Sequence, residues 1–109
     1  MPDLVLRGGT VVDANGERSA DVVVRDGIIT DVGAGVPLPA GADVLDVEGC
    51  IVAPGLVDLH AHLREPGDED AETIESGARA AALGGYSAVV AMPNTDPPVD
   101  SASVVDQIR

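Results

Sequence analysis

Between residues 4 and 52 the hydrophobic positions fall in short runs that turn residues separate, a pattern typical of β-strands. The runs are rich in valine and isoleucine, and Asp26-Gly27 between two of them is the strongest hairpin signal in the chain. Such close spacing predicts a small antiparallel sheet or sandwich, with a turn at Gly8-Gly9. The expected strands are 4–6, 10–12, 22–24, 28–32, 44–47 and 50–52.

From Gly55 onward the pattern changes to strands that alternate with helices, which is typical of a parallel α/β sheet. Because two parallel strands cannot bury both of their faces, we expect the chain to be the N-terminal part of a longer α/β protein. The expected elements are a strand at 56–60, an alanine-rich helix at 71–83, a strand at 86–92 that is covered on both faces, and a further helix that Ser101 caps. We expect the helix at 71–83 to have Asp68 and Glu69 at its exposed start, Asp70 as its N-cap and Gly84-Gly85 at its end.

The composition limits both the core and the partners. The chain has 19 acidic residues against 6 arginines and no lysine, a net charge of −13, and Tyr86 is its only aromatic residue. We therefore expect a small core of β-branched residues beneath a solvated acidic surface. This charge argues against nucleic acid as a partner. No uncharged stretch reaches the roughly 20 residues that span a bilayer, and the single cysteine, Cys50, excludes an internal disulfide and fits a cytoplasmic location.

Four chemically active residues follow one another at alternate positions near the strand at 56–60. With the period of two of a β-strand, Asp58, His60, His62 and Arg64 share one face, so the two imidazoles point at one place. Neutral imidazole suits zinc, but a catalytic zinc usually takes at least three protein ligands, and the chain has no other histidine. The spacing alone leaves open a metal pair or ordinary histidines. It likewise leaves Asp58 as an acceptor that orients a histidine or as a plain strand residue.

Longer motifs add a resemblance to a known family. The segment 54–67, which contains His-Leu-Arg-Glu-Pro-Gly, and the segment 92–95, Met-Pro-Asn-Thr, are similar to those of dihydroorotase in the amidohydrolase superfamily. The likeness runs over essentially the whole chain. Related cyclic amidohydrolases share the His-x-His and the Gly-Gly turn but usually differ at the positions of Arg64 and Asn94.

The resemblance implies a fold, a reaction and site residues. Residues 1–54 would belong to a small β-sandwich domain, and residues 55–109 would be the first two β/α units of a TIM-like (β/α)8 metal-dependent hydrolase barrel. The reaction would interconvert N-carbamoyl-L-aspartate and dihydroorotate in pyrimidine biosynthesis. His60 and His62 would hold one or two zinc ions that polarise the carbonyl and generate a hydroxide. Arg64 and Asn94 would hold the carboxylate of this small anionic substrate.

The resemblance also implies parts that this stretch lacks. The remaining histidines, a catalytic aspartate and a bridging aspartate or carboxylated lysine are expected beyond Arg109, so the stretch alone is not expected to be active. Alternatives are an allantoinase or dihydropyrimidinase, against which Arg64 and Asn94 argue, and a non-catalytic homologue that scaffolds aspartate carbamoyltransferase, against which His60 and His62 weigh. A homo-oligomer or a complex with that transcarbamoylase is an expected assembly.

Overall fold

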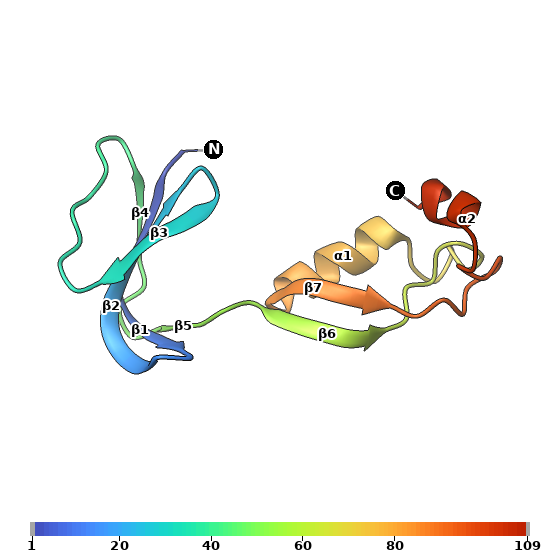
Figure 1. Cartoon of the computed structure of the whole chain (residues 1–109), viewed down its shortest axis with the longest axis horizontal. Helices are drawn as coiled ribbons and strands as arrows, with labels where there is room; N and C mark the ends of the chain where they lie inside the picture. The colour runs from blue at the N-terminus through green and yellow to red at the C-terminus, as the bar shows by residue number, and fades with distance from the viewer. Residues whose placement is uncertain (1, 109) are drawn as a thin grey trace. The chain divides into compact units, whose positions relative to one another are not determined.

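The computed structural model describes residues 2–108, and the chain divides into two compact units, Met1–Pro54 and Gly55–Arg109 (Figure 1). Within the described residues, no helix has both the length and the apolar character needed to cross a membrane.

The first unit is a single mixed sheet, which corrects the expectation that its strands all run antiparallel. Its strands lie in the order β3-β2-β1-β4, and β5 pairs with a further part of β1. The hairpin pairs are antiparallel, but β4 and β5 both run parallel to β1, because the long connection after β3 returns the chain to the start of β1. The strands are β1 (Leu4–Asp13), β2 (Gly16–Arg25), β3 (Ile28–Gly33), β4 (Asp43–Asp46) and β5 (Ile51–Val52).

The predicted turn at Gly8-Gly9 is wrong, since both glycines lie inside the continuous strand β1. They form a bulge, where the register with β2 shifts between Leu6 and Gly9. Gly8 adopts a φ of +78°, and its N–H donates to Asp21 Oδ1 at 2.9 Å. A side chain on Gly9 would place its Cβ 2.7 Å from Val52 Cγ2. The glycines therefore allow β1 to bend and to receive β5 closely.

The predicted hairpin at Asp26-Gly27 and the predicted valine-rich core are both confirmed. Asp26 (φ 49°) and Gly27 (φ 77°) form a two-residue loop between β2 and β3, with both residues left-handed as a type I′ turn requires. The core of this unit is a cluster of small side chains, and no polar or charged residue of the described chain is buried, so the acids lie on the surface. The cluster consists of Val11, Ala20 and Val22, with Leu6, Val24 and Val52 packed against it.

The second unit is a β-α-β motif followed by a short helix, as predicted. The strands β6 (Leu56–Ala61) and β7 (Tyr86–Ala91) lie side by side and run parallel, and α1 (Ile74–Leu83) packs against β7 (Figure 1). Ser101 occupies the N-cap position of α2 (Ala102–Gln107), as predicted, but its side chain makes no capping hydrogen bond to any described residue. The expectation that β7 is covered on both faces fails here, because Val90 is 48% exposed. One helix and one neighbouring strand cannot cover a parallel strand completely.

The start of α1 also differs from the prediction. The helix begins at Ile74, three residues later than expected, and its N-cap is Thr73 in place of Asp70. Thr73 Oγ1 accepts the Ser76 N–H at 3.1 Å, and Ser76 Oγ accepts the Thr73 N–H at 3.0 Å. This reciprocal pair satisfies two backbone donors at once, which the Asp70 position does not offer. The helix ends before Gly84, as predicted.

The pair Asp13–Arg18 predicts a pH-dependent contribution to stability. Both guanidinium NH2 groups of Arg18 donate to the Asp13 carboxylate at 2.9 Å, and the bond from Arg18 is the largest cause that lowers the pKa of Asp13. A lowered carboxyl pKa stabilises the fold above the unfolded-state pKa of about 3.9, and this contribution disappears as pH falls through the folded-state pKa. We expect Asp13→Asn to lower the thermal midpoint at pH 7 and to lose that difference near pH 2.

The matched control is Asp31→Asn on β3, which removes the same charge at an exposed position. Thermal unfolding followed by circular dichroism between pH 7 and pH 2 measures both variants. A difference for Asp13→Asn that is independent of pH would contradict the assignment.

Candidate functional site

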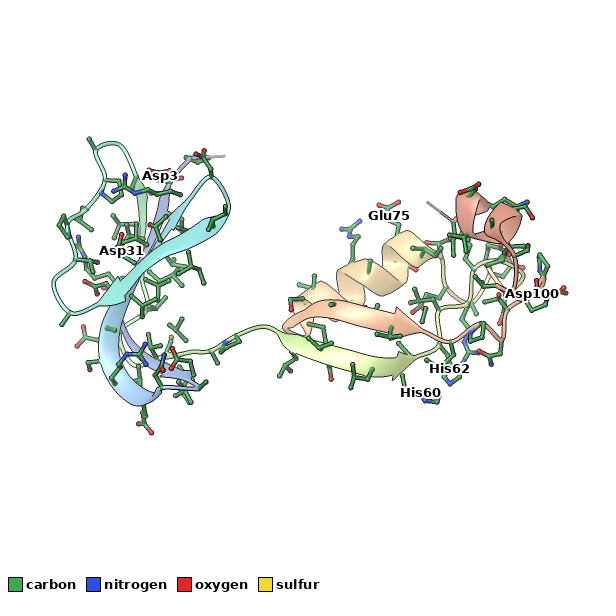
Figure 2. All side chains as sticks on the ribbon, viewed as in Figure 1. Asp3, Asp31, His60, His62, Glu75 and Asp100 are labelled. Atoms are coloured by element: carbon green, nitrogen blue, oxygen red, sulfur yellow. The ribbon has the colours of Figure 1, made fainter. Side chains whose placement is uncertain are left out.

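Two histidines mark the C-terminal end of β6. His60 is the penultimate residue of the strand, and His62 follows its last residue, Ala61. Figure 2 shows both side chains where the arrow of β6 ends. Their ring centroids are 5.1 Å apart, the ring planes are inclined by 59°, and both residues are exposed. The structure thus brings the two imidazoles to one place, where a single ion can reach both.

The chain after β7 brings Asn94 to this same place. The Met92 N–H donates to the Ala61 carbonyl oxygen at 2.8 Å, which ties the end of β7 to the end of β6. Two residues further on, Asn94 Oδ1 lies 2.9 Å from His62 Nδ1. An amide oxygen only accepts, so a hydrogen bond between these two atoms requires a proton on Nδ1, and a neutral His62 that makes it carries its lone pair on Nε2. The spacing of the histidines did not reveal this contact, because its partner is 32 residues away.

Asp58 bonds to the backbone instead of to an imidazole. Its Oδ1 accepts the N–H of His60 at 2.9 Å. In the part of the chain that the structure describes, no hydrogen bond joins the Asp58 carboxylate to either histidine ring. The carboxylate holds the backbone at the position that carries His60, and the acceptor beside a ring is Asn94.

A cavity of about 240 Å³ is lined by Asn94, the residue that contacts His62, although neither histidine lines it. Arg64 and Asn94, the two residues predicted to hold a carboxylate, both line it. Arg64 is exposed and takes part in no ion pair with any residue between 2 and 108, so its guanidinium is free for an anion. The lining comes from the two segments that follow β6 and β7: Leu63, Arg64, Pro66, Gly67 and Asp68, then Asn94, Thr95 and Asp96.

These two segments are held together at Gly67. The Asp96 N–H donates to the Pro66 carbonyl oxygen at 3.0 Å. Gly67 adopts a φ of +109°, and a side chain there would collide with the Asp96 carbonyl oxygen and lie 2.7 Å from Asp96 Cβ. Glycine at this position therefore lets the segment that carries Arg64 approach the segment that carries Asn94.

Glutamates complete the support of this segment, one of them unnoticed in the sequence. Glu65 Oε2 accepts the N–H of Ile74, the first residue of α1, at 2.7 Å, where a negative charge also suits the helix dipole. Glu69, expected at the start of the helix, instead accepts the Gly67 N–H at 2.9 Å, and this bond lowers the pKa of Glu69. In the sequence, an acid in the loop before a helix would have indicated this role for Glu65. The role was missed because α1 begins at Ile74, three residues later than expected.

The donor set fits part of a metal site. Two neutral imidazoles suit zinc, and one of them already has its Nε2 lone pair free. Among residues 2–108, no group of three or more histidine, cysteine, aspartate or glutamate side chains is placed to hold an ion. A zinc ion bound by His60 and His62 would therefore need further ligands.

The contact at Gly67 yields a stability prediction with a matched control. Gly85 has a similar left-handed φ of +85°, but a Cβ there would have no atom within 4 Å. Gly85→Ala carries only the backbone strain, about 1 kcal/mol, whereas Gly67→Ala adds the collision with Asp96 and should lower the free energy of unfolding by about 3 kcal/mol. Urea unfolding of both variants measures the difference. Equal losses would show that the two segments separate without strain.

Comparison with known proteins places these features in a family. Residues 49–109 match the family model described as dihydro-orotase-like. The chain is 53% identical to a dihydroorotase of Solibacter usitatus over 110 residues, which cover 99% of this chain and 25% of that protein. It is also 53% identical to a dihydroorotase of Mycobacterium tuberculosis over 104 residues, 95% of this chain and 24% of that protein. The chain thus spans about a quarter of the length of these relatives.

Solved structures of related enzymes share the fold. An L-hydantoinase (dihydropyrimidinase) from Arthrobacter aurescens superposes with a TM-score of 0.83 at 28% identity, over 98% of this chain and 24% of that one. A D-hydantoinase from Bacillus sp. AR9 superposes with a TM-score of 0.78 at 34% identity, over 95% and 23%. The family match over more than half of the residues, together with the 53% identity to dihydroorotases, shows that this chain belongs to the dihydro-orotase-like family.

Proposed function

We propose that the protein is a dihydroorotase-type, zinc-dependent cyclic amide hydrolase that interconverts N-carbamoyl-L-aspartate and dihydroorotate. The observation that carries this proposal is that Asn94 contacts His62, the neighbour of His60, and also lines a cavity together with Arg64. The pairing of a metal-type site with a free cation suits a substrate that has both a cyclic amide and a carboxylate. The curated relatives named dihydroorotase, at 42–53% identity, add support.

We further propose that residues 55–109 are the first two β/α units of a (β/α)8 barrel and that residues 1–54 belong to a small β-sandwich domain. The parallel pair of β6 and β7 with α1 between them supports the barrel, as does the exposure of Leu59 (73%) and Val57 (54%), which further strands would cover. The histidines lie at the C-terminal end of a strand, where barrel enzymes build their active sites.

In this proposal His60 and His62 hold the zinc together with ligands from strands beyond Arg109, which also bring the catalytic aspartate and the bridging group. That bridge is an aspartate or a carboxylated lysine, and a lysine would have to come from outside the present 109 residues, which contain none. When bound there, zinc would supply Lewis-acid polarisation of the amide carbonyl and activation of water near neutral pH.

Arg64 and Asn94 orient the substrate. In the hydrolytic direction water adds to the ring carbonyl and the ring C–N bond breaks, while the carboxylate outside the ring is unchanged and serves as a handle. The planar guanidinium of Arg64 grips this carboxylate through two parallel hydrogen bonds, and the Asn94 amide adds a donor without a competing charge. Local positive charge at this cavity is necessary, because the chain as a whole carries −13.

The free guanidinium also separates the proposal from its rivals. Dihydrouracil and hydantoin lack a carboxylate, so a dihydropyrimidinase has no need for Arg64 in the cavity. A non-catalytic scaffold for aspartate carbamoyltransferase has no need for the paired imidazoles of His60 and His62. We propose a cytoplasmic enzyme, which the free, exposed Cys50 suits, and one that works as a homo-oligomer or in complex with that transcarbamoylase.

The direct test uses the intact protein that carries this chain. We expect bound zinc by elemental analysis and the cyclisation of N-carbamoyl-L-aspartate in a coupled assay. Protein that hydrolyses only allantoin, dihydrouracil or hydantoin would redirect the assignment to those enzymes. If the protein binds no metal and turns over none of these substrates, only the non-catalytic scaffold remains as an explanation.

The role of Arg64 predicts a specific defect. Arg64→Lys keeps the charge but loses the paired hydrogen bonds, so KM for N-carbamoyl-L-aspartate should rise about 10- to 100-fold while zinc content stays at the wild-type level. Arg79→Lys on α1 is the matched control, because Arg79 is exposed, does not line this cavity and forms its ion pair with Glu75. Loss of zinc in Arg64→Lys would show that Arg64 supports the metal site instead of the substrate.

A further inference from the structure

Asn94, which is proposed to bind the substrate, also forms a hydrogen bond with His62. Asn94 Oδ1 and His62 Nδ1 are 2.9 Å apart, and the contact joins the segments that follow the two parallel strands. His60, whose ring centroid lies only 5.1 Å away, has no ring hydrogen bond within residues 2–108. One histidine of the pair therefore has a fixed partner and the other does not.

We propose that Asn94 is a positioning residue that holds His62 as the Nδ1–H tautomer and so presents Nε2 to the metal. This inference rests on the proposed function for the presence of the metal. A neutral imidazole without a partner exchanges its proton between the two nitrogens, and only the nitrogen that lacks a proton binds a metal. The acceptor oxygen of Asn94 removes this exchange and also sets the plane of the ring.

The backbone around Asn94 is built to deliver this amide. On one side the Met92 N–H is bonded to the Ala61 carbonyl oxygen at 2.8 Å, and on the other the Asp96 N–H is bonded to the Pro66 carbonyl oxygen at 3.0 Å. Asn94 is thus anchored two residues before and two residues after its own position. Such support lets a short side chain hold an exposed imidazole in one orientation.

The two ends of the amide have separate tasks. Oδ1 faces His62, which leaves the two N–H groups of Nδ2 for the carboxylate of the substrate. Asn94 thereby links the ring that binds the metal to the cavity that binds the anion. An aspartate at this position keeps the acceptor for His62 but loses the donor, and an alanine loses both, so the two substitutions separate the tasks.

The test measures zinc affinity by competition with a chelator, on the intact protein and without substrate. We expect Asn94→Ala to weaken zinc binding about 10- to 100-fold, the usual effect of removing a group that orients a metal ligand. Asn94→Asp should retain affinity within about threefold, because a carboxylate also accepts from Nδ1–H. The control is Thr95→Val, which removes only a local bond from Thr95 Oγ1 to the Pro97 carbonyl oxygen at 2.8 Å and should leave zinc affinity unchanged.

A spectroscopic measurement reports the tautomer itself. In zinc-free protein labelled with 15N-histidine, His62 should show a protonated Nδ1 and an unprotonated Nε2 in the wild type and in Asn94→Asp. In Asn94→Ala its two nitrogens should shift toward averaged values. The signals of His62 are identified by their loss in His62→Gln.

Different outcomes separate the two proposals. Unchanged zinc affinity and an unchanged tautomer in Asn94→Ala would overturn the positioning role, even if the protein cyclises N-carbamoyl-L-aspartate. An equal loss of zinc in Asn94→Asp, or in Thr95→Val, would overturn it as well, because the acceptor would not be what matters. The predicted zinc and tautomer changes in a protein without cyclisation activity would support the positioning role and refute the proposed function.

Discussion

The parallel pairing of β6 with β7 is the constraint on which the candidate site depends. Because both strands end at the same edge, the residues that follow them meet in space although they are about 30 positions apart in the chain. The bond from the Met92 N–H to the Ala61 carbonyl oxygen continues this pairing one step past the strands. His62 and Asn94 touch only because this edge is shared.

A second level of support comes from the loop that leaves β6. Glu65 fastens it to the first N–H of α1, and Gly67 lets it press against the backbone of Asp96. The loop is therefore held by a helix on one side and by the neighbouring loop on the other. Arg64 directly precedes these two attachments, so the backbone from which its exposed side chain extends is fixed on that side.

The electrostatics of the chain oppose the ligand that the site suits. An anion approaches a protein of net charge −13 whose acids lie on the surface. Among residues 2–108, Arg64 is the one cation that lines the cavity, beside the acids Asp68 and Asp96, so its guanidinium alone does not make the cavity positive. The metal that the two histidines are proposed to bind would have to supply the rest of the positive charge.

Local patterns in the sequence determined much of this protein. Short hydrophobic runs between turn residues indicated the strands, Asp26-Gly27 marked its turn, and the spacing of His60 and His62 placed both imidazoles at one strand end, because each of these depends on a few neighbouring residues. The same local patterns led to the wrong prediction of a turn at Gly8-Gly9. Whether two glycines form a turn or a bulge depends on the pairing with the distant strands β2 and β5.

The tertiary structure alone decided the contacts that shape the site. The sequence placed the N-cap of α1 at Asp70 and not at Thr73. The hydroxyls of Thr73 and Ser76 compete with the preceding acids for the backbone donors at the helix start, and only the folded geometry determines which of them bind. The bond of Asn94 to His62 and the contact of Gly67 with Asp96 join residues far apart in the chain. Such contacts leave no periodic trace in the sequence, because they exist only once parallel strands have brought their ends together.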